Sequence, residues 1–161
     1  MSSLPIDRRT LRRPRRGRGF TLIELMVVIA VLVILIVLAA PAFTEMIASQ
    51  RVQTASADLI TSLARARSEA IKQNLDVTIT PNGTWAGGWI VASTAGNLEV
   101  RPATNGIAIG SGPASVTFRS NGRLAPGESP KFSFSASSTG TTRCVQVGLS
   151  GQPVVTKVAC T

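Results

Sequence analysis

Residues 15–43 read RRGRGFTLIELMVVIAVLVILIVLAAPAF, and this stretch sets the architecture of the chain. From Leu25 to Ala40 it holds 16 consecutive apolar residues. A helix over residues 20–43 would be roughly 36 Å long at about 1.5 Å per residue, and the hydrocarbon core of a bilayer is about 30 Å thick. The sequence therefore predicts a helix over residues 20–43 that crosses a membrane.

Two other interpretations of the apolar run fit the sequence less well. A helix buried in a soluble core needs protein on every face, and a small domain cannot surround 16 apolar residues in this way. A cleaved secretory signal needs a small-residue cleavage site after the run. Instead, the chain continues past Pro41 as further amphipathic helix. We therefore expect the span to remain in the mature protein.

The positive charge of the chain is concentrated before this helix. Seven of the 17 basic residues precede Phe20, and with the single acid Asp7 they give residues 1–19 a net charge of +6. The rest of the chain has ten basic and seven acidic side chains, a net charge of only +3. By the positive-inside rule the arginines stay in the cytoplasm and the carboxy-terminal part is translocated.

Glu24 is unusual because it places a carboxylate in the apolar segment. An ionisable side chain there is costly and commonly marks function. The simplest alternative is that it snorkels to the nearby headgroups. A cationic partner arises if the chain is cut before Phe20, because the new terminal amine then lies four residues upstream, one helical turn away, or on a neighbouring subunit.

The stretch RGFTLIELMVVIAVLVIL closely resembles the class III signal of type IV prepilins and type II secretion pseudopilins. The resemblance implies cleavage between Gly19 and Phe20 by a membrane prepilin peptidase, and methylation of the Phe20 amine. It also implies that Glu24 pairs with the terminal amine of a neighbour during filament assembly. Pro41 resembles the proline at which pilin helices kink, since it lacks a donor and clashes with the preceding turn.

Residues 44–74 continue the helix as an amphipathic segment. They contain no Gly or Pro, and apolar residues recur at helical spacing on one face. That face consists of Val52, Ala55, Leu59, Leu63, Ala66 and Ala70. On the outer side we expect ion pairs between Arg65 and Glu69 and between Glu69 and Lys72.

Residues 75–161 are rich in β-forming residues, with Asn-Gly turn signals at 82–83, 105–106 and 121–122. We predict strands at 75–80, 88–93, 97–101, 115–119, 131–135, 143–149 and 153–159. The fold class is therefore α+β and type IV pilin-like: one long helix packed on an antiparallel β-sheet or β-sandwich. The predicted division is a leader over 1–19, an assembly helix over 20–43, its continuation over 44–74 and a β-domain over 75–161.

Three further stretches resemble the FimT/GspH-type minor pilins and pseudopilins. They are LARARSEAIKQN at the helix end, TWAGGWIVAS, and VTFRSNGRLAP. Together with the signal they cover most of the chain in order. We expect Trp85 and Trp89 to pack in the core at a tight Gly87-Gly88 turn, in preference to stacking on a ligand.

The two cysteines can be placed on a hairpin. If the last two strands fold about Gln152, facing residues have numbers that sum to 304, and Cys144 faces Cys160. Facing residues lie about 4.5–5.5 Å apart at Cα, which is within disulfide range. We expect a disulfide that contributes roughly 3 kcal/mol. Two thiols without further Cys or His do not make a metal site.

The composition argues against an enzyme. The chain has no His, the commonest general base. It also has neither a phosphate-binding P-loop nor a Gly-x-Ser-x-Gly elbow. We therefore expect no catalytic residue, no cofactor and no metal.

A basic surface near the carboxy terminus raises the question of DNA. It comprises Arg119, Arg123, Lys131, Arg143 and Lys157, against Glu128 as the only acid after residue 118. Such residues could neutralise phosphates without reading bases. The DNA-binding members of the family carry a Gly-Arg-x-Arg motif in the final hairpin. The matching turn here, residues 151–154, reads GQPV and has neither arginine.

The resemblance implies a structural subunit. We predict a minor pilin incorporated into a type IV pilus, with a further role in DNA uptake during natural transformation as a finer hypothesis. The alternative is a GspH-type pseudopilin of the type II secretion system. Its partners would be other pilins or pseudopilins, the prepilin peptidase, the inner membrane and, in the finer hypothesis, DNA. It would be a single-pass inner-membrane protein with a periplasmic carboxy-terminal domain until it enters the filament.

Overall fold

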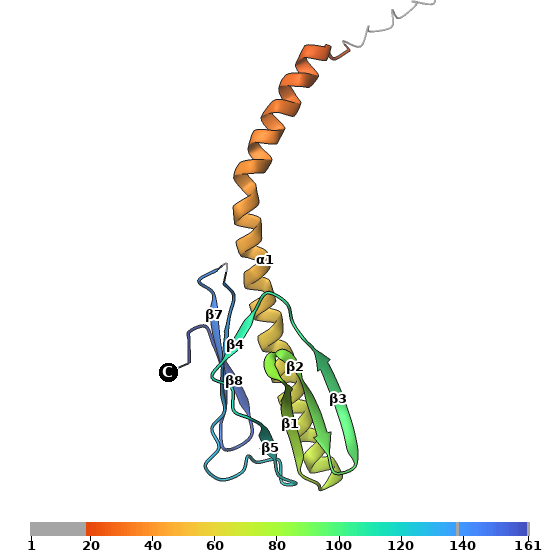
Figure 1. The fold of residues 1–161 in the computed structure, drawn as a ribbon, viewed down its shortest axis with the longest axis vertical. Helices are drawn as coiled ribbons and strands as arrows, with labels where there is room; N and C mark the ends of the chain where they lie inside the picture. The colour runs from red at the N-terminus through yellow and green to blue at the C-terminus, as the bar shows by residue number, and fades with distance from the viewer. Residues whose placement is uncertain (1–18, 138, 161) are drawn as a thin grey trace, which may run out of the picture. The chain divides into compact units, whose positions relative to one another are not determined.

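The computed structural model describes residues 19–137 and 139–160 (Figure 1). The predicted leader lies outside the described residues except for Gly19. The chain divides into a first unit that ends at Ala39 and a second unit, Ala40–Thr161. Helix α1 (Leu22–Gln73) contributes residues to both units.

The first unit consists of the apolar beginning of α1. In the described part of the chain, α1 is the one helix long and apolar enough to cross a membrane, and its most apolar 18-residue window has no buried residue. The helix begins after Thr21, whose Oγ1 accepts a hydrogen bond from the Glu24 N–H at 3.3 Å. Thr21 is thus the N-cap, with Glu24 three residues later, in the Thr-x-x-Glu spacing of a capping box.

The second unit contains the amphipathic part of α1, and the predicted apolar face is confirmed. All six of its residues are buried. The helix ends at Gln73, and the next residue, Asn74, adopts a left-handed φ of 54°. The Leu75 N–H donates back to the Ala70 carbonyl at 3.3 Å, which is the hydrogen bond of a Schellman C-cap.

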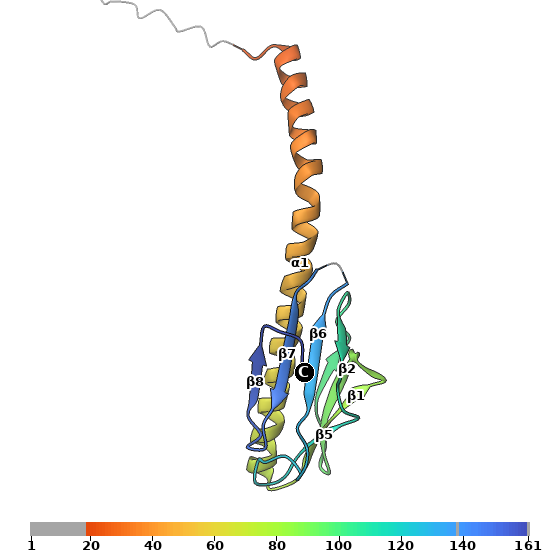
Figure 2. The same ribbon diagram turned by 90° about the vertical axis from the view of Figure 1, so that its left-hand side faces the viewer.

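Two four-stranded antiparallel sheets make up the rest of this unit (Figure 2). The first sheet has the order β3-β2-β1-β5. Its strands are β1 (Val77–Asn82), β2 (Thr84–Ser93), β3 (Gly96–Pro102) and β5 (Val116–Phe118). The second sheet has the order β4-β6-β7-β8. Its strands are β4 (Ala108–Gly110), β6 (Lys131–Ser135), β7 (Thr142–Val147) and β8 (Pro153–Thr156).

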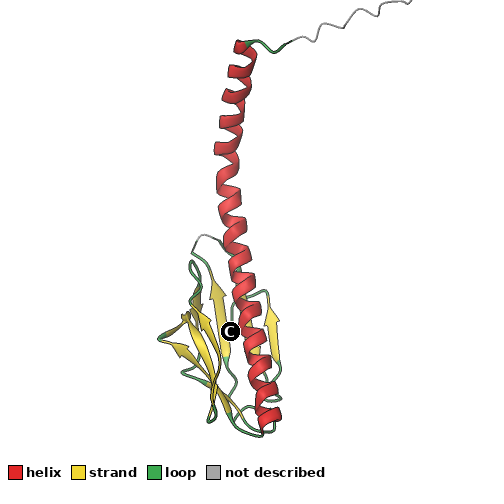
Figure 3. Ribbon diagram, turned by 90° about the vertical axis from the view of Figure 1, so that its right-hand side faces the viewer, coloured by secondary structure: helices red, strands yellow, loops and turns green. Residues whose placement is uncertain are grey.

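One hydrophobic core joins the helix to both sheets (Figure 3). Leu59 and Leu63 of α1 belong to the same buried cluster as Val91 of the first sheet and Phe132 and Phe134 of the second. This is the predicted α+β architecture, a long amino-terminal helix on antiparallel sheets. Strand β4 was not predicted, because three residues in a Gly-rich segment give no readable alternation.

The predicted Gly87-Gly88 turn is wrong, because both glycines lie within β2. Asn82 pairs with Thr84 and Pro81 with Trp89, so residues 85–88 have no partner on β1 and form a bulge. The predicted packing of the two tryptophans is confirmed, since both side chains are buried. The Trp85 Nε1–H donates to the Pro113 carbonyl at 2.7 Å.

Of the two ion pairs predicted at the helix end, the one between Glu69 and Lys72 is confirmed and the one between Arg65 and Glu69 is wrong. Lys72 pairs with Glu69 at 3.7 Å, but Arg65 pairs with Glu99 of β3 at 3.4 Å. Glu99 also accepts a hydrogen bond from the buried Ser62 hydroxyl at 2.8 Å. Sequence spacing on the helix could not reveal this partner, which only the tertiary fold brings close.

A hydrogen bond also changes the acidity of Glu69, on the outer side of the helix. The Gln73 side-chain amide donates to the Glu69 carboxylate at 2.8 Å. This bond, helped by the charge of Lys72, lowers the pKa of Glu69 from its ordinary value. The lowered pKa favours the ionised form of Glu69.

The structure contains the expected Cys144–Cys160 disulfide, with 5.0 Å between the two Cα atoms. The hairpin register that led to this prediction is wrong. Val145 pairs with Val155, and Cys144 pairs with Thr156. Strand β8 ends at Thr156, so the tail after it must leave the ladder for Cys160 to reach Cys144.

Candidate functional sites

The residues expected to direct processing lie at the start of α1. Gly19, Phe20 and Thr21 precede the helix and are exposed. Glu24 is also exposed, and within the described residues its carboxylate has no ion pair. Its charge lies in the first helical turn, where it also stabilises the helix dipole. An exposed, unpaired carboxylate at this position is available to a cation from outside the chain.

The role of Thr21 as N-cap was not predicted. Its signal was nevertheless in the sequence, because TLIE has the Thr-x-x-Glu spacing of a capping box ahead of an apolar run. The cap bond uses the backbone N–H of Glu24, so the local role of its carboxylate is the favourable interaction with the helix dipole. An experiment on Glu24 must separate this role from the proposed pairing.

Pro41 lies inside α1, two residues after the boundary between the units at Ala39. It cannot donate to the carbonyl four residues earlier. The Thr44 hydroxyl donates to the Pro41 carbonyl at 2.7 Å, a local bond that competes with the helical ladder. A kink at Pro41 in the assembled filament stays a prediction.

The five predicted basic residues do not form one surface. Arg143 shares the face of β7 that carries the buried Val145, and its guanidinium donates to Gln53 of α1 at 3.2 Å. Lys131 lies on the opposite face of the same sheet, since it alternates with the buried Phe132 on β6. Lys157 is exposed just beyond β8.

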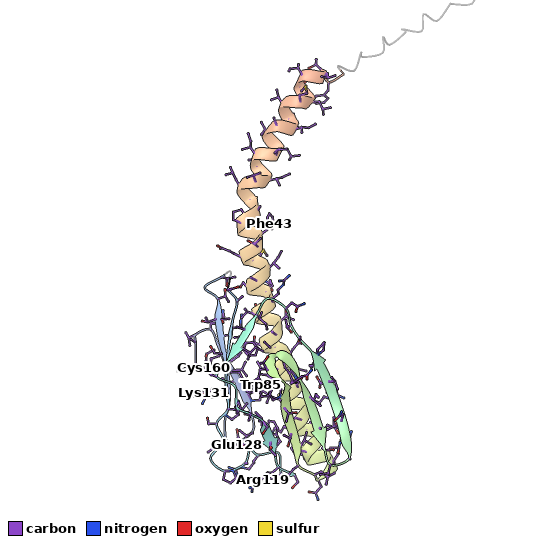
Figure 4. All side chains as sticks on the ribbon, in the orientation of Figure 1. Phe43, Trp85, Arg119, Glu128, Lys131 and Cys160 are labelled. Atoms are coloured by element: carbon purple, nitrogen blue, oxygen red, sulfur yellow. A yellow bond between two sulfur atoms is a disulfide. The ribbon has the colours of Figure 1, made fainter. Side chains whose placement is uncertain are left out.

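Arg119 and Arg123 do come together, at the end of the second unit where Figure 4 labels Arg119. The Arg119 N–H donates to the Arg123 carbonyl at 2.9 Å. Both line a hollow of about 420 Å³, called here the basic hollow. Its lining residues are Arg119, Asn121, Arg123, Leu124, Pro126, Gly127 and Leu149. Within the described residues, neither guanidinium has an ion pair.

Arg67 of α1 holds the basic hollow in place. Its Nε–H donates to the Gly122 carbonyl at 3.1 Å. Gly151, with a φ of 78°, packs so closely that a Cβ there would overlap the same carbonyl. The turn that carries the arginines and the last hairpin turn are therefore fixed against each other, and Leu149 of the latter lines the hollow.

No group of three or more His, Cys, Asp or Glu side chains that could hold a metal occurs within residues 19–137 and 139–160.

Two sequence profiles match the chain. The family described as "Type II transport protein GspH" matches residues 55–151. The "Prokaryotic N-terminal methylation motif" matches residues 14–40. A comparison with curated proteins finds no match.

The fold is similar to that of the type IV minor pilin FimU of Pseudomonas aeruginosa strain PAO1. One crystal structure of FimU has 24% sequence identity and a TM-score of 0.55, over 65% of this chain and 91% of FimU. A second crystal form has 22% identity and a TM-score of 0.56, over 71% of this chain and 92% of FimU. At these identities the similarity shows a shared fold. Because the GspH profile spans more than half of its residues, the chain belongs to the GspH family of type II transport proteins, with a prokaryotic N-terminal methylation motif.

Proposed function

We propose that the protein is a minor pilin, a structural subunit that enters a type IV pilus. The observation that carries this proposal is the methylation motif at residues 14–40, which leads into an apolar helix with no buried residue in its most apolar window. Such a helix needs a membrane or other apolar helices around it. The same observation fits a GspH-type pseudopilin of the type II secretion system, which is the alternative.

The proposed route to the filament begins in the inner membrane. A prepilin peptidase removes residues 1–19 and the Phe20 amine is methylated. Residues 20–43 then anchor the chain, residues 44–74 continue the helix, and residues 75–161 form the periplasmic domain. During assembly the Glu24 carboxylate pairs with the terminal amine of a neighbouring subunit.

The test is the location of the chain in cells. Filaments are sheared from a prokaryotic host that produces them, and the chain is detected with an antibody in the filament and membrane fractions. Presence in sheared type IV pili supports the minor pilin proposal. Presence only in fibres that depend on the type II secretion genes supports the alternative, and absence from both contradicts the proposal.

DNA capture is a second candidate function, and the basic hollow favours it. Its two guanidinium groups have no ion pair within the described residues, and Arg67 fixes it beside the final hairpin turn. That turn lacks the arginines of the family's DNA-binding motif, but Arg119 and Arg123 bring two positive charges to the same end of the domain. Phosphate contacts of this kind give weak, salt-dependent binding without sequence preference.

A gel-shift titration with the full chain in detergent tests this second function. Replacing Arg119 and Arg123 by Ala is expected to weaken binding and to reduce the slope of log affinity against log salt by about 1.8, since two phosphate contacts are lost. The matched control is Lys157→Ala, an exposed lysine outside the hollow. Failure of the unaltered chain to bind at low salt would contradict DNA capture.

A further inference from the structure

The second unit begins close to the predicted membrane surface. Its helix is exposed from Phe43 to Ile47, and burial against the sheets begins at Ala48. If the hydrocarbon core of the bilayer ends at Phe43, Ala48 lies roughly 7.5 Å beyond it, at about 1.5 Å per residue. The headgroup layer on each side of a bilayer is about 5–8 Å thick. The end of the unit at which α1 enters it therefore meets the lipid headgroups.

The start of β7 lies beside the first buried turn of α1 at this end. The Thr141 hydroxyl forms a hydrogen bond with the Ser49 hydroxyl at 3.3 Å. The Arg143 guanidinium donates to the Gln53 side-chain oxygen at 3.2 Å. The Arg143 Nε is buried and, within the described residues, has no acceptor. The hydrogen-bonding capacity of this guanidinium is therefore not used up inside the domain.

Two exposed cations lie at the same end. The Arg51 guanidinium packs against Gly106, in the connection between β3 and β4, and a helical side chain leans toward the amino terminus of its helix, which is here the membrane side. Lys157 directly follows β8, whose last residue pairs with Cys144, the neighbour of Arg143 in the chain. Arg51, Arg143 and Lys157 are called here the basic rim.

Carboxylates do not neutralise the basic rim. Within residues 19–137 and 139–160, none of its three side chains has an ion pair. Arg101, the next arginine of the first sheet, is by contrast paired with both Glu99 and Asp58. Glu45 is the only acid on α1 between Phe43 and Arg51. Three cations and this one carboxylate leave an excess of two positive charges in the headgroup layer.

We propose that the basic rim binds the phosphate groups of anionic phospholipids in the leaflet from which the second unit emerges. This inference rests on the proposed function, because residues 20–43 must anchor the chain in a membrane. A negative surface potential attracts Arg and Lys side chains next to the membrane, and guanidinium groups form bidentate hydrogen bonds with phosphate. The bound lipids hold the domain in one orientation before assembly, and these contacts break when the subunit leaves the membrane for a filament.

The full chain in nanodiscs tests this lipid contact. A fluorophore is attached through Asn105→Cys, at an exposed residue next to Gly106, or through Leu149→Cys in the basic hollow. Within the described residues the chain has no free thiol of its own. The discs contain phosphatidylcholine alone or with phosphatidylglycerol, and a lipid with a nitroxide on its headgroup quenches the fluorophore. Time-resolved fluorescence gives the ratio of quenched to unquenched chains.

Phosphatidylglycerol is expected to raise this ratio for the fluorophore at residue 105 by at least about fivefold, and added salt should reverse the increase. The fluorophore at residue 149 should remain unquenched in both discs. The readout is local to the basic rim, because the arginines of residues 1–19 lie on the other side of the predicted span.

Charge variants then identify the groups that make the contact. Arg51→Gln and Lys157→Gln should each lower the ratio at residue 105 by about fivefold in the anionic discs, and Glu45→Gln should raise it by a similar factor. The matched control is Arg119→Gln with Arg123→Gln, which removes two charges from the basic hollow. Arg67, which holds the hollow, is 16 residues after Arg51, or roughly 24 Å along the helix. Salt screens charges over about 8–10 Å, so this control should leave the ratio unchanged.

Three outcomes would overturn the inference: equal quenching at residue 105 in the two kinds of disc, equal losses from the rim and hollow variants, or stronger quenching at residue 149 than at residue 105. Extraction of the discs with alkali separates this inference from the proposed function. A chain that resists extraction but shows no effect of phosphatidylglycerol contradicts only the lipid contact. A chain that is extracted has no membrane anchor, which contradicts both the proposed function and the contact.

Discussion

Replacing Glu24 by Gln is expected to leave the chain in the membrane and to reduce its incorporation into filaments by on the order of 100-fold or more. In the proposed filament this carboxylate pairs with a terminal amine among apolar helices. Removal of one partner from a buried ion pair costs about 3–5 kcal/mol, and each 1.4 kcal/mol is about tenfold. The measurement is the ratio of chain in sheared filaments to chain in membranes.

The cap at Thr21 requires its own control. The cap bond uses the backbone N–H of residue 24, so Glu24→Gln removes the charge and retains this bond. Thr21→Ala removes the hydrogen bond from the Glu24 N–H and keeps the carboxylate. It costs about 1 kcal/mol of helix stability and should reduce incorporation far less. Normal incorporation of Glu24→Gln would mean that the carboxylate only snorkels to the headgroups.

The second large effect is expected from Gly88→Ala in the β2 bulge. Gly88 has a φ of 94°, and a Cβ there would overlap the Arg101 carbonyl oxygen and lie 2.8 Å from the Pro102 carbonyl carbon. These are backbone atoms of the paired strand and cannot rotate away. Backbone strain costs about 1–3 kcal/mol and overpacking about as much again. The total is a large part of the stability of a small domain.

Gly96→Ala is the matched control in the same strand pair. Gly96 also has a left-handed φ, 132°, but a Cβ there would meet no atom within 4 Å. Its substitution should cost only the backbone strain, about 1–3 kcal/mol. The free energies of unfolding of the two variants are compared by urea unfolding of the full chain in detergent, monitored by tryptophan fluorescence. If the two variants lose the same free energy of unfolding, the close approach to the Arg101 carbonyl is not the reason that position 88 requires glycine.

Patterns within one element predicted the helix well. The spacing of residues from Val52 to Ala70 identified the face that packs on the sheets, because a helix has a fixed period. The pairing of β7 with β8 could not be predicted in this way. The predicted and observed registers differ by four in the sum of facing residue numbers. An even shift of this kind leaves every side chain on the same face of the sheet, so the alternation of apolar residues does not distinguish the two registers. The left-handed Gly151 and its hydrogen bond to the Gly148 carbonyl close the turn at an earlier position.

The candidate sites show the same limit. Arg119 and Arg123 could be grouped from the sequence because one short turn carries both. Lys131 and Arg143 lie on the neighbouring strands β6 and β7. Arg143 pairs with Phe134 and so shares its face of the sheet, whereas Lys131 lies on the other face, and this pairing is known only from the structure. The position of the hollow against α1 depends on the contact of Arg67 with Gly122, which joins residues 55 apart in sequence.

In the proposed assembly, processing creates the amine with which Glu24 pairs. This processing is tested by intact-mass and amino-terminal peptide analysis of the chain from host membranes. We expect a mature chain that begins at Phe20 with a methylated amine, retains the apolar helix and contains the Cys144–Cys160 disulfide. A chain that retains residues 1–19, or one cut after the apolar helix, would contradict it.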